Sequence, residues 1–192
     1  MLAASSELES PVFRCKWSLP VIIVLASGPR RFSELSRSLG ASPKTLAKKL
    51  EMLVLHGYIK SGGYGYVLAE RGETVAEIVR PLTRHIDVKA LADVIKCKWS
   101  REILVLLLKG PCYSSEVVAA LPGISWKVAS ERLRKLVGHG LVSRFVEASE
   151  SPVRIRYDLT VRGKLLASWL KTYVMAGRPS SEYKAAQSYY SV

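Results

Sequence analysis

Hydrophobic positions in the first part of this chain follow the spacing of short helices. An apolar run at residues 21–26 is closed by a Gly-Pro pair, which commonly stops a helix. A second short helical stretch follows at 32–39 and ends at Gly40. The pattern predicts two helices, and a tight turn after the second of them.

A third helix is expected to begin directly after Ser42. A seryl oxygen can accept hydrogen bonds from the free amides of a first helical turn, and a proline at the next position suits the start of a helix. Leu46, Leu50 and Leu53 then fall within a narrow arc at about 3.6 residues per turn. This face of the helix is therefore expected to pack inward.

The pattern changes to alternating β-prone residues after Gly57. The runs 58–59 and 64–68 are joined by Ser-Gly-Gly at 61–63, which predicts a hairpin, and a mostly apolar helix is expected at 73–86. Helix, helix, helix, hairpin, helix is the order of a winged helix-turn-helix domain, in which the hairpin is the wing.

The same pattern occurs a second time. Cys-Lys-Trp-Ser at 15–18 returns at 97–100, and Gly-Pro at 28–29 returns at 110–111, both 82 residues later. One inserted residue, Pro122, raises the shift to 83, so that Ser42 corresponds to Ser125. In the second copy, the same pattern predicts helices at 102–108 and 114–121 and strands at 141–147 and 153–160. Between them it predicts a helix capped by Ser125, with Ala129, Leu133 and Leu136 facing inward. The Arg-Gly pair 71–72 meets 162–163 at a shift of 91, which places about eight extra residues in the second wing, around its turn at 149–152.

We therefore expect an α+β, mainly α, fold of two tandem winged helix-turn-helix domains, each with about three to four helices and a β-hairpin wing. The first domain is expected at 1–86 and the second at 87–176, starting with a helix at 88–95 and with no flexible linker between them. The tail 177–192 is expected to be poorly ordered or engaged by a partner.

Charge adds a candidate partner to this fold. The chain has 192 residues, of which 29 are Lys or Arg and 16 are Asp or Glu, a net charge of +13. Such an excess attracts polyanions, with double-stranded DNA the first candidate, although solubility or adaptation to heat would explain it equally well.

A helix-turn-helix inserts its second helix into the major groove, so residues opposite the buried stripe can reach base edges. In the first copy these are Ser42, Lys44, Thr45, Lys48 and Lys49. In the second copy they are Lys127, Ser130, Glu131 and Arg134. Glu131 stands where the first copy has Lys48. A carboxylate is repelled by phosphates but can accept a hydrogen bond from the amino group of cytosine. The second head is therefore expected to read a different sequence or to bind more weakly. The other interpretation is an ordinary solvated helix face.

The wings supply further basic residues. Lys60 stands beside a glycine-rich tip, and Arg154 and Arg156 share one face of a strand, where they are expected to straddle phosphates or enter the minor groove. A charged edge strand that resists aggregation is the alternative. Trp17, Trp99 and Trp126 are each interpreted as packing residues.

No pattern in the chain predicts catalysis. There is no Walker or Rossmann glycine spacing and no nucleophile elbow, so we expect no enzyme and no cofactor. Cys15, Cys97 and Cys112 lack metal-ligand spacing and are expected to be free, and Cys15 and Cys97 are expected to be small, buried core thiols. The dispersed histidines 56, 85 and 139, of which 56 and 139 fall at the equivalent helix end in the two copies, are expected to be structural, with no metal site. The apolar run at 21–26 is far shorter than the ~20 residues a membrane-spanning helix needs, and the first ten residues carry no basic cluster, so a cytoplasmic protein is expected.

Several motifs resemble the HxlR-type winged-helix transcription regulators. These motifs are Lys-Trp before an Ile/Leu-rich helix, GPRRFSEL at 28–35, LPGIS at 121–125, and Tyr-Asp-Leu-Thr at 157–160 followed by Arg-Gly. The resemblance implies a DNA-binding regulator. It also implies that the two copies could pack as a single-chain pseudo-dimer, since members of that family usually carry one module and pair as homodimers. Some members sense oxidants through a cysteine well upstream of Lys-Trp; here Cys15 and Cys97 stand directly beside it, so that role is not carried over.

Two other classes of function remain open from the sequence. Tandem winged helices also serve as protein-interaction scaffolds or basal transcription subunits that bind DNA weakly or not at all, and they occur within nucleic-acid enzymes, although 192 residues leave no room for a catalytic module. Self-association is compatible with either, and no effector can be identified from the residues.

Overall fold

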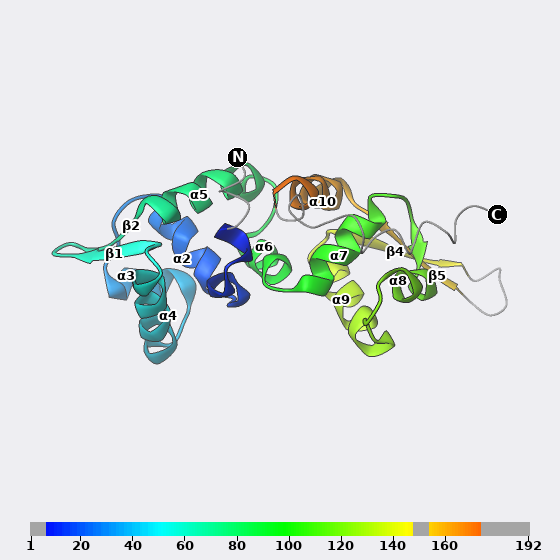
Figure 1. The fold of residues 1–192 in the computed structure, drawn as a ribbon, viewed down its shortest axis with the longest axis horizontal. Coiled ribbons are helices and arrows are strands. Elements are labelled where there is room, and N and C mark those ends of the chain that lie inside the picture. Colours follow the sequence, from blue (N-terminus) through cyan, green and yellow to red (C-terminus); the bar gives the residue numbers. More distant parts are fainter. Residues whose placement is uncertain (1–6, 148–153, 174–192) are drawn as a thin grey trace. The chain divides into compact units, whose positions relative to one another are not determined.

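The computed structural model describes residues 7–147 and 154–173, and their contacts divide into two compact units, one up to Cys97 and one from Lys98 onward (Figure 1). Each unit is described by itself. The turn expected at 149–152 and the tail expected at 177–192 lie outside the described residues.

The first unit is mainly helical, with one small sheet. Its elements in chain order are η1 (Pro11–Arg14), α2 (Ser18–Leu25), α3 (Phe32–Leu39), α4 (Pro43–Leu55), β1 (Ile59–Gly62), β2 (Gly65–Leu68), α5 (Glu70–Thr83) and α6 (Val88–Ile95). Strands β1 and β2 pair antiparallel, from Ile59 opposite Leu68 to Gly62 opposite Gly65. The expected helices and hairpin are all present within one or a few residues of their predicted bounds.

The second unit repeats this order around a three-stranded sheet. Its elements are α7 (Lys98–Leu107), β3 (Cys112–Tyr113), α8 (Ser114–Ala120), α9 (Trp126–Gly138), β4 (Val142–Glu147), β5 (Arg154–Leu159) and α10 (Val161–Tyr173). The strand order is β3-β5-β4, all antiparallel. In the first unit, the place of the β3–β5 pairing is taken by a single bridge between Arg30 and Tyr66, which align with Cys112 and Tyr157. The α+β, mainly helical winged-helix fold is thereby confirmed.

The two serine caps are confirmed at the starts of α4 and α9. The Oγ of Ser42 accepts a hydrogen bond from the amide of Thr45 at 3.4 Å, and the Oγ of Ser125 accepts from the amide of Val128 at 3.3 Å. Both helices are 13 residues long. Because each cap satisfies a free amide of the first turn, it fixes where the helix begins.

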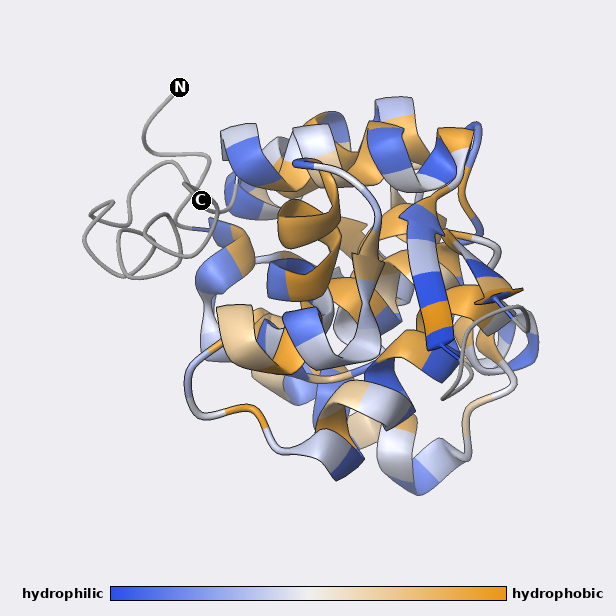
Figure 2. Cartoon of the chain, turned by 90° about the vertical axis from the view of Figure 1, so that its right-hand side faces the viewer, coloured by the Kyte–Doolittle hydropathy of each residue, from blue (hydrophilic) through white to orange (hydrophobic). Residues whose placement is uncertain are grey.

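The inward stripes of these helices are also confirmed. Leu46, Leu50 and Leu53 of α4 and Ala129, Leu133 and Leu136 of α9 are all buried. Along the helices in Figure 2, hydrophobic residues are interspersed with hydrophilic ones, as expected of amphipathic helices that cover a core on one side.

The Arg-Gly pairs that marked the repeat have a structural cause. A Cβ on Gly72 would lie 2.0 Å from the carbonyl oxygen of Tyr58, and a Cβ on Gly163 would lie 1.9 Å from that of Leu141. In each copy, therefore, the helix after the wing lies against the backbone where the wing begins, and only glycine allows this approach.

The helix at 88–95 packs within the first unit. Helix α6 contacts α2 and η1, so the boundary between units defined by contacts follows Cys97 rather than Ile86. The domain boundary at 86/87 stays a prediction, because it was drawn from the repeat in the sequence. The repeat and the packing unit differ at α6, which belongs to the second repeat but packs on the core of the first unit.

Three predictions about apolar residues need correction. Trp126 is not a packing residue, since 54% of its surface is exposed, and Trp17 and Trp99 are only half-buried. Lys16 lies 4.8 Å from the ring centre of Trp17, and Lys98 lies 4.9 Å from that of Trp99, so each indole is partly covered by a cation.

The cysteines are free, as predicted, but only one of them is a core thiol. Cys112 is buried, and burial raises the pKa of its thiol to about 11. Cys15 and Cys97 are half-buried. The expectation that Cys15 and Cys97 are buried core thiols is therefore wrong, because these two residues precede the first core helix of each copy and do not lie within it.

Candidate nucleic-acid interface

Helix α4 presents a basic face opposite its buried stripe. Lys44, Thr45 and Lys48 are exposed and Lys49 is half-buried, as the angular spacing predicts. Ser42 is exposed too, but its hydroxyl donates to the Oγ1 of Thr45 at 2.9 Å as well as capping the helix. The three lysines are thus the cations that α4 offers to solvent, and Ser42 caps the helix from which they project.

Helix α9 carries its charges differently. Lys127, Ser130 and Arg134 are exposed, but the carboxylate of Glu131 is held by two cations of its own helix: it lies 2.9 Å from Arg132 and 3.4 Å from Lys135. These ion pairs offset the negative charge that the sequence placed at the centre of the face.

Helix α9 has as much positive charge as α4, but the charge is distributed differently along the helix. Helix α4 contains three lysines and one glutamate, whereas α9 contains two lysines, two arginines and one glutamate. Arg134 and Lys135 occupy the positions of Glu51 and Met52, so the positive charge of α9 extends toward its C-terminal half. Taken as a whole, helix α9 is therefore at least as basic as helix α4.

Matching carboxylates fix the preceding short helices. The side chain of Glu34 accepts a hydrogen bond from the amide of Arg31 at 2.6 Å, and Glu116 does the same for the amide of Tyr113 at 2.7 Å. Both helices α3 and α8 therefore begin at aligned positions in the two copies.

The first wing is tied to the start of α3. Arg30 and Tyr66 exchange two backbone hydrogen bonds of 3.1 and 2.8 Å, and a Cβ on Gly65 would lie 2.4 Å from the carbonyl oxygen of Arg30. Lys60 is exposed on β1, as expected, and Arg31 is exposed next to this bridge. Arg31 is a basic residue that our sequence reasoning did not include, although the Arg-Arg pair before a short helix was a visible signal.

The outward face of the second wing forms a linked cluster. Arg154 and Arg156 do share a strand face, as predicted, together with Phe145 and Glu147 of β4 and Tyr113 of β3. The Nε of Arg156 donates to Glu147 at 2.8 Å and its guanidinium lies 5.3 Å from the ring centre of Phe145. The guanidinium of Arg154 lies 5.1 Å from the ring centre of Tyr113.

The carboxylate of Glu147 organises this cluster. It accepts a hydrogen bond from the hydroxyl of Tyr113 at 2.7 Å, and this bond, together with the hydrogen bond and the charge of Arg156, lowers the pKa of Glu147. Arg156 is consequently engaged within the sheet, whereas Arg154 is exposed. The sequence could not show this difference, because alternation along one strand places both guanidiniums on one face but does not identify the residues on the neighbouring strands.

A second network joins the N-terminal segment to the first wing. Glu7 accepts hydrogen bonds from the hydroxyl of Tyr58 at 2.7 Å and from Nη2 of Arg71 at 2.8 Å, and Arg71 also donates to the backbone oxygen of His56 at 2.6 Å. Burial acts to raise the pKa of Glu7, but the hydrogen bonds and the charge of Arg71 outweigh it and lower that pKa. The network fixes the end of α4 to the root of the wing.

The expected absences concern only the part of the chain that the structure describes. Within residues 7–147 and 154–173, there is no group of three His, Cys, Asp or Glu side chains placed to hold a metal ion. No helix in those ranges is long and apolar enough to cross a membrane. His56 and His139 form the C-caps of α4 and α9, as the sequence placed them.

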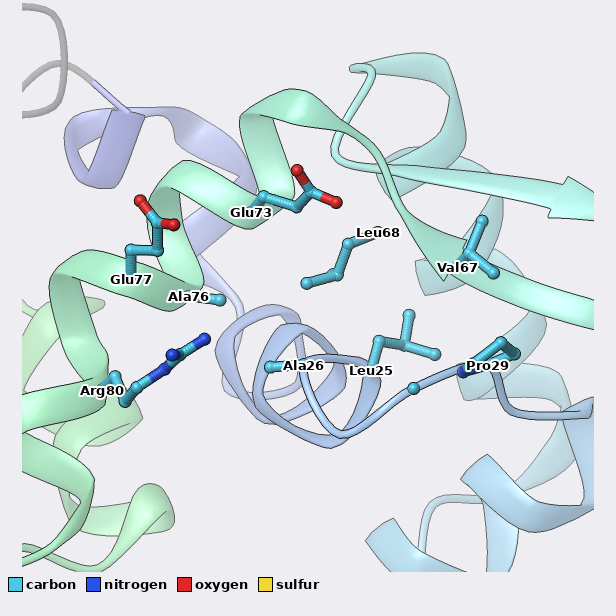
Figure 3. A pocket seen from close by; sticks show the side chains of 10 residues that line it. Leu25, Ala26, Pro29, Val67, Leu68, Glu73, Ala76, Glu77 and Arg80 are labelled. Atoms are coloured by element: carbon cyan, nitrogen blue, oxygen red, sulfur yellow. The ribbon is translucent and has the colours of Figure 1, made fainter.

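One pocket of about 360 Å³ lies in the first unit, between the end of α2, strand β2 and helix α5. In Figure 3, Glu73, Glu77 and Arg80 of α5 line it across from Leu25 and Ala26. The second copy has Leu108 at the position of Ala26, Asp158 at that of Val67 and Ser168 at that of Glu77. The lining is therefore particular to the first copy.

Comparison with known proteins agrees with this architecture. The profile of the HxlR-like helix-turn-helix family matches residues 12–90 and again residues 94–181. The uncharacterized HTH-type transcriptional regulator YvaP of Bacillus subtilis is 47% identical over 75 residues, which are 39% of this chain and 68% of YvaP. A regulator of the same description from Synechocystis, sll1512, is 40% identical over 83 residues, 43% of this chain and 61% of its own length.

Among solved structures, a MarR-family transcriptional regulator of Enterococcus faecalis is 32% identical, covers 50% of this chain and 86% of its own, and has a TM-score of 0.41. The reduced form of YodB from Bacillus subtilis is 26% identical, covers 47% and 95%, and has a TM-score of 0.37. Because the family profile matches both copies and together these matches span most of the sequence, the chain belongs to the HxlR-like helix-turn-helix family, of which it carries two tandem domains.

Proposed function

We propose that this chain is a transcriptional regulator that binds double-stranded DNA in a sequence-specific manner through two non-identical winged-helix heads. The observation that carries the proposal is the pair of serine-capped helices, α4 and α9, each with a buried stripe on one side and exposed cations on the other. A helix of this kind fits the major groove, where donors such as lysine and arginine can reach guanine. The printed names of the relatives, which are HTH-type transcriptional regulators, support the same function.

The residues of each head have distinct proposed roles. Lys44, Thr45 and Lys48 of α4 and Lys127, Ser130 and Arg134 of α9 face base edges and adjacent phosphates. Lys49, Lys60 and Arg154 contact phosphates at the edge of the footprint. Ser42, Glu131 and Arg156 act mainly by holding neighbours in place, since each of them is engaged in hydrogen bonds or ion pairs of its own head.

Carrying two heads on one chain has a consequence for the operator. We propose that the chain works as a single-chain pseudo-dimer that addresses two unlike half-sites about one helical turn apart. Selection of bound sequences from a random duplex pool by the purified protein is expected to yield two different half-motifs at a fixed spacing. A single motif, or an affinity indifferent to that spacing, would contradict the pseudo-dimer while leaving DNA binding intact.

Salt dependence tests DNA binding itself. The logarithm of the affinity should fall with the logarithm of salt concentration by roughly 0.9 for each phosphate contacted. Lys44→Ala or Arg154→Ala is expected to flatten this slope by about one contact. Lys89→Ala, which removes the same charge from an exposed position on α6, serves as the control and should leave the slope unchanged. Negligible affinity for duplex at low salt would favour a protein-interaction scaffold instead.

A further inference from the structure

An exposed tryptophan stands at the start of α9, on the surface proposed to meet DNA. Trp126 is the first residue of the helix, directly after the capping Ser125, and 54% of its surface is exposed. The indole of Trp169, by contrast, is 8% exposed. A large apolar ring left open to water in this way loses the free energy that burial would supply, so its position calls for a physical explanation.

The exposure follows from the place of Trp126 on the helix. By angle alone it lies about 20° from the buried Leu133, two turns further on, which predicts a packed side chain. The Cα–Cβ bonds of a helix tilt toward its N-terminus, however, so a side chain on the first residue leans past the end of the helix. Beyond that end lies the turn through Pro122 and Gly123, both exposed, which leaves the indole uncovered.

The surroundings of Trp126 match duplex DNA rather than an apolar partner. Lys127, the next residue, is exposed, and so are Ser130 and Arg134 further along the same helix. An aromatic ring next to a lysine suits a surface that offers apolar groups between phosphates. In the major groove, the one exposed apolar group on a base edge is the 5-methyl group of thymine.

Resting on the proposed function, we propose that Trp126 reads thymine for the second head: its indole packs against the 5-methyl group of a thymine in the major groove, while Lys127 binds the adjacent phosphate. The first head has Pro43 at this position, without an aromatic ring. The thymine preference therefore belongs to one half-site only. It adds a source of asymmetry that is independent of the charge difference between Lys48 and Glu131.

The test removes the methyl group alone. In a duplex obtained by selection with the full chain, each thymine is replaced in turn by uracil, and dissociation constants are measured for the wild type and variants. At one or two positions of the second half-site the wild type should lose about fourfold in affinity, the value expected for about 0.8 kcal/mol per buried methyl group. Trp126→Ala should bind the thymine and uracil duplexes equally, and Trp126→Phe should retain part of the difference.

Two matched variants locate the effect. Lys127→Ala should weaken binding to both duplexes alike and preserve the methyl effect, and Pro43→Ala in the first head should also preserve it. An unchanged methyl effect in Trp126→Ala would overturn this inference but not DNA binding. If the wild type binds no duplex at low salt, the proposed function fails instead. Circular dichroism of each variant confirms that it folds, which is expected because Trp126 is exposed.

Discussion

The two copies agree where the backbone needs a particular residue and differ where side chains meet solvent. Both begin the outward helix with a serine cap, both hold the preceding helix with a glutamate, and both place a glycine where the last helix touches the wing. At exposed positions Lys48 is replaced by Glu131 and Pro43 by Trp126. The comparison indicates that the geometry of a DNA-reading head has been kept twice while the chemistry it presents has diverged.

The wings are also stabilised by different means. The first wing has a single bridge to Arg30 and the network of Glu7, Tyr58 and Arg71, whereas the second has a true third strand and the cluster around Glu147. Tyr58 is Leu141 in the second copy, which cannot accept or donate a hydrogen bond through its side chain. Similar wing positions are thus reached by a long-range charged network in one copy and by strand pairing in the other.

The largest predicted effect concerns what the copies share. Replacing Gly72 or Gly163 by alanine places a Cβ 2.0 or 1.9 Å from a backbone oxygen, far inside van der Waals contact, so each substitution should destabilise its unit by about 3–5 kcal/mol. Gly138→Ala is the control: it lies within α9, nothing lies within 4 Å of its added Cβ, and it should stabilise by about 0.5–1 kcal/mol. Urea unfolding measures both. If Gly163→Ala and Gly138→Ala changed the free energy of unfolding equally, the close approach of the last helix to the wing would be contradicted.

A smaller effect should separate the two units. Glu7→Gln removes charge-assisted hydrogen bonds and is expected to destabilise the first unit by about 1–2 kcal/mol, toward the lower end because Arg71 is exposed. Since the pKa of Glu7 is lowered by folding, its contribution is present above the unfolded pKa and is lost as pH falls through the folded pKa.

Urea unfolding of the first unit should therefore become less pH-dependent below about pH 5 in Glu7→Gln than in the wild type. Glu51→Gln, a change of the same chemistry at an exposed position of α4, is the comparison. The same acid sensitivity in Glu7→Gln and the wild type would show that the network does not stabilise the first wing.

The difference between the outward helices can be reversed by one substitution. Glu131→Lys restores the charge of Lys48, so nonspecific affinity for duplex should rise and the salt slope should steepen by up to about 0.9. The loss of the ion pairs with Arg132 and Lys135 should cost no more than about 0.5 kcal/mol of stability. Filter binding over a series of salt concentrations measures the slope, and a flatter slope would show that Glu131 acts by positioning its cationic neighbours.

The smallest effect is one of reactivity. With a pKa of about 11, Cys112 is a thiolate in only about one molecule in a thousand at pH 8, and it is buried, so a thiol-alkylating reagent should modify it far more slowly than Cys15 or Cys97. Mass spectrometry of the native protein after timed exposure distinguishes the three sites. Rapid labelling of Cys112 would mean that the second unit opens readily around β3.

Much of the fold was predictable because it depends on short-range spacing. The periodic leucines, the serine caps and the glycine landmarks act within one or two helical turns, so the order of elements and the inward face of α4 and α9 follow directly from the sequence. The outward positions of Lys44, Lys48 and Lys127 follow from the same periodicity.

Only the tertiary structure decided which side chains are held by hydrogen bonds or ion pairs and which are exposed to solvent. The carboxylate of Glu7 meets Arg71 from 64 positions away, and Tyr113 meets Glu147 from 34 positions away. No local pattern encodes such pairings, because they depend on how separate elements pack. For the same reason the angle of Trp126 on its helix predicts a buried side chain, whereas its place at the first residue of α9 leaves it exposed in the part of the chain that the structure describes.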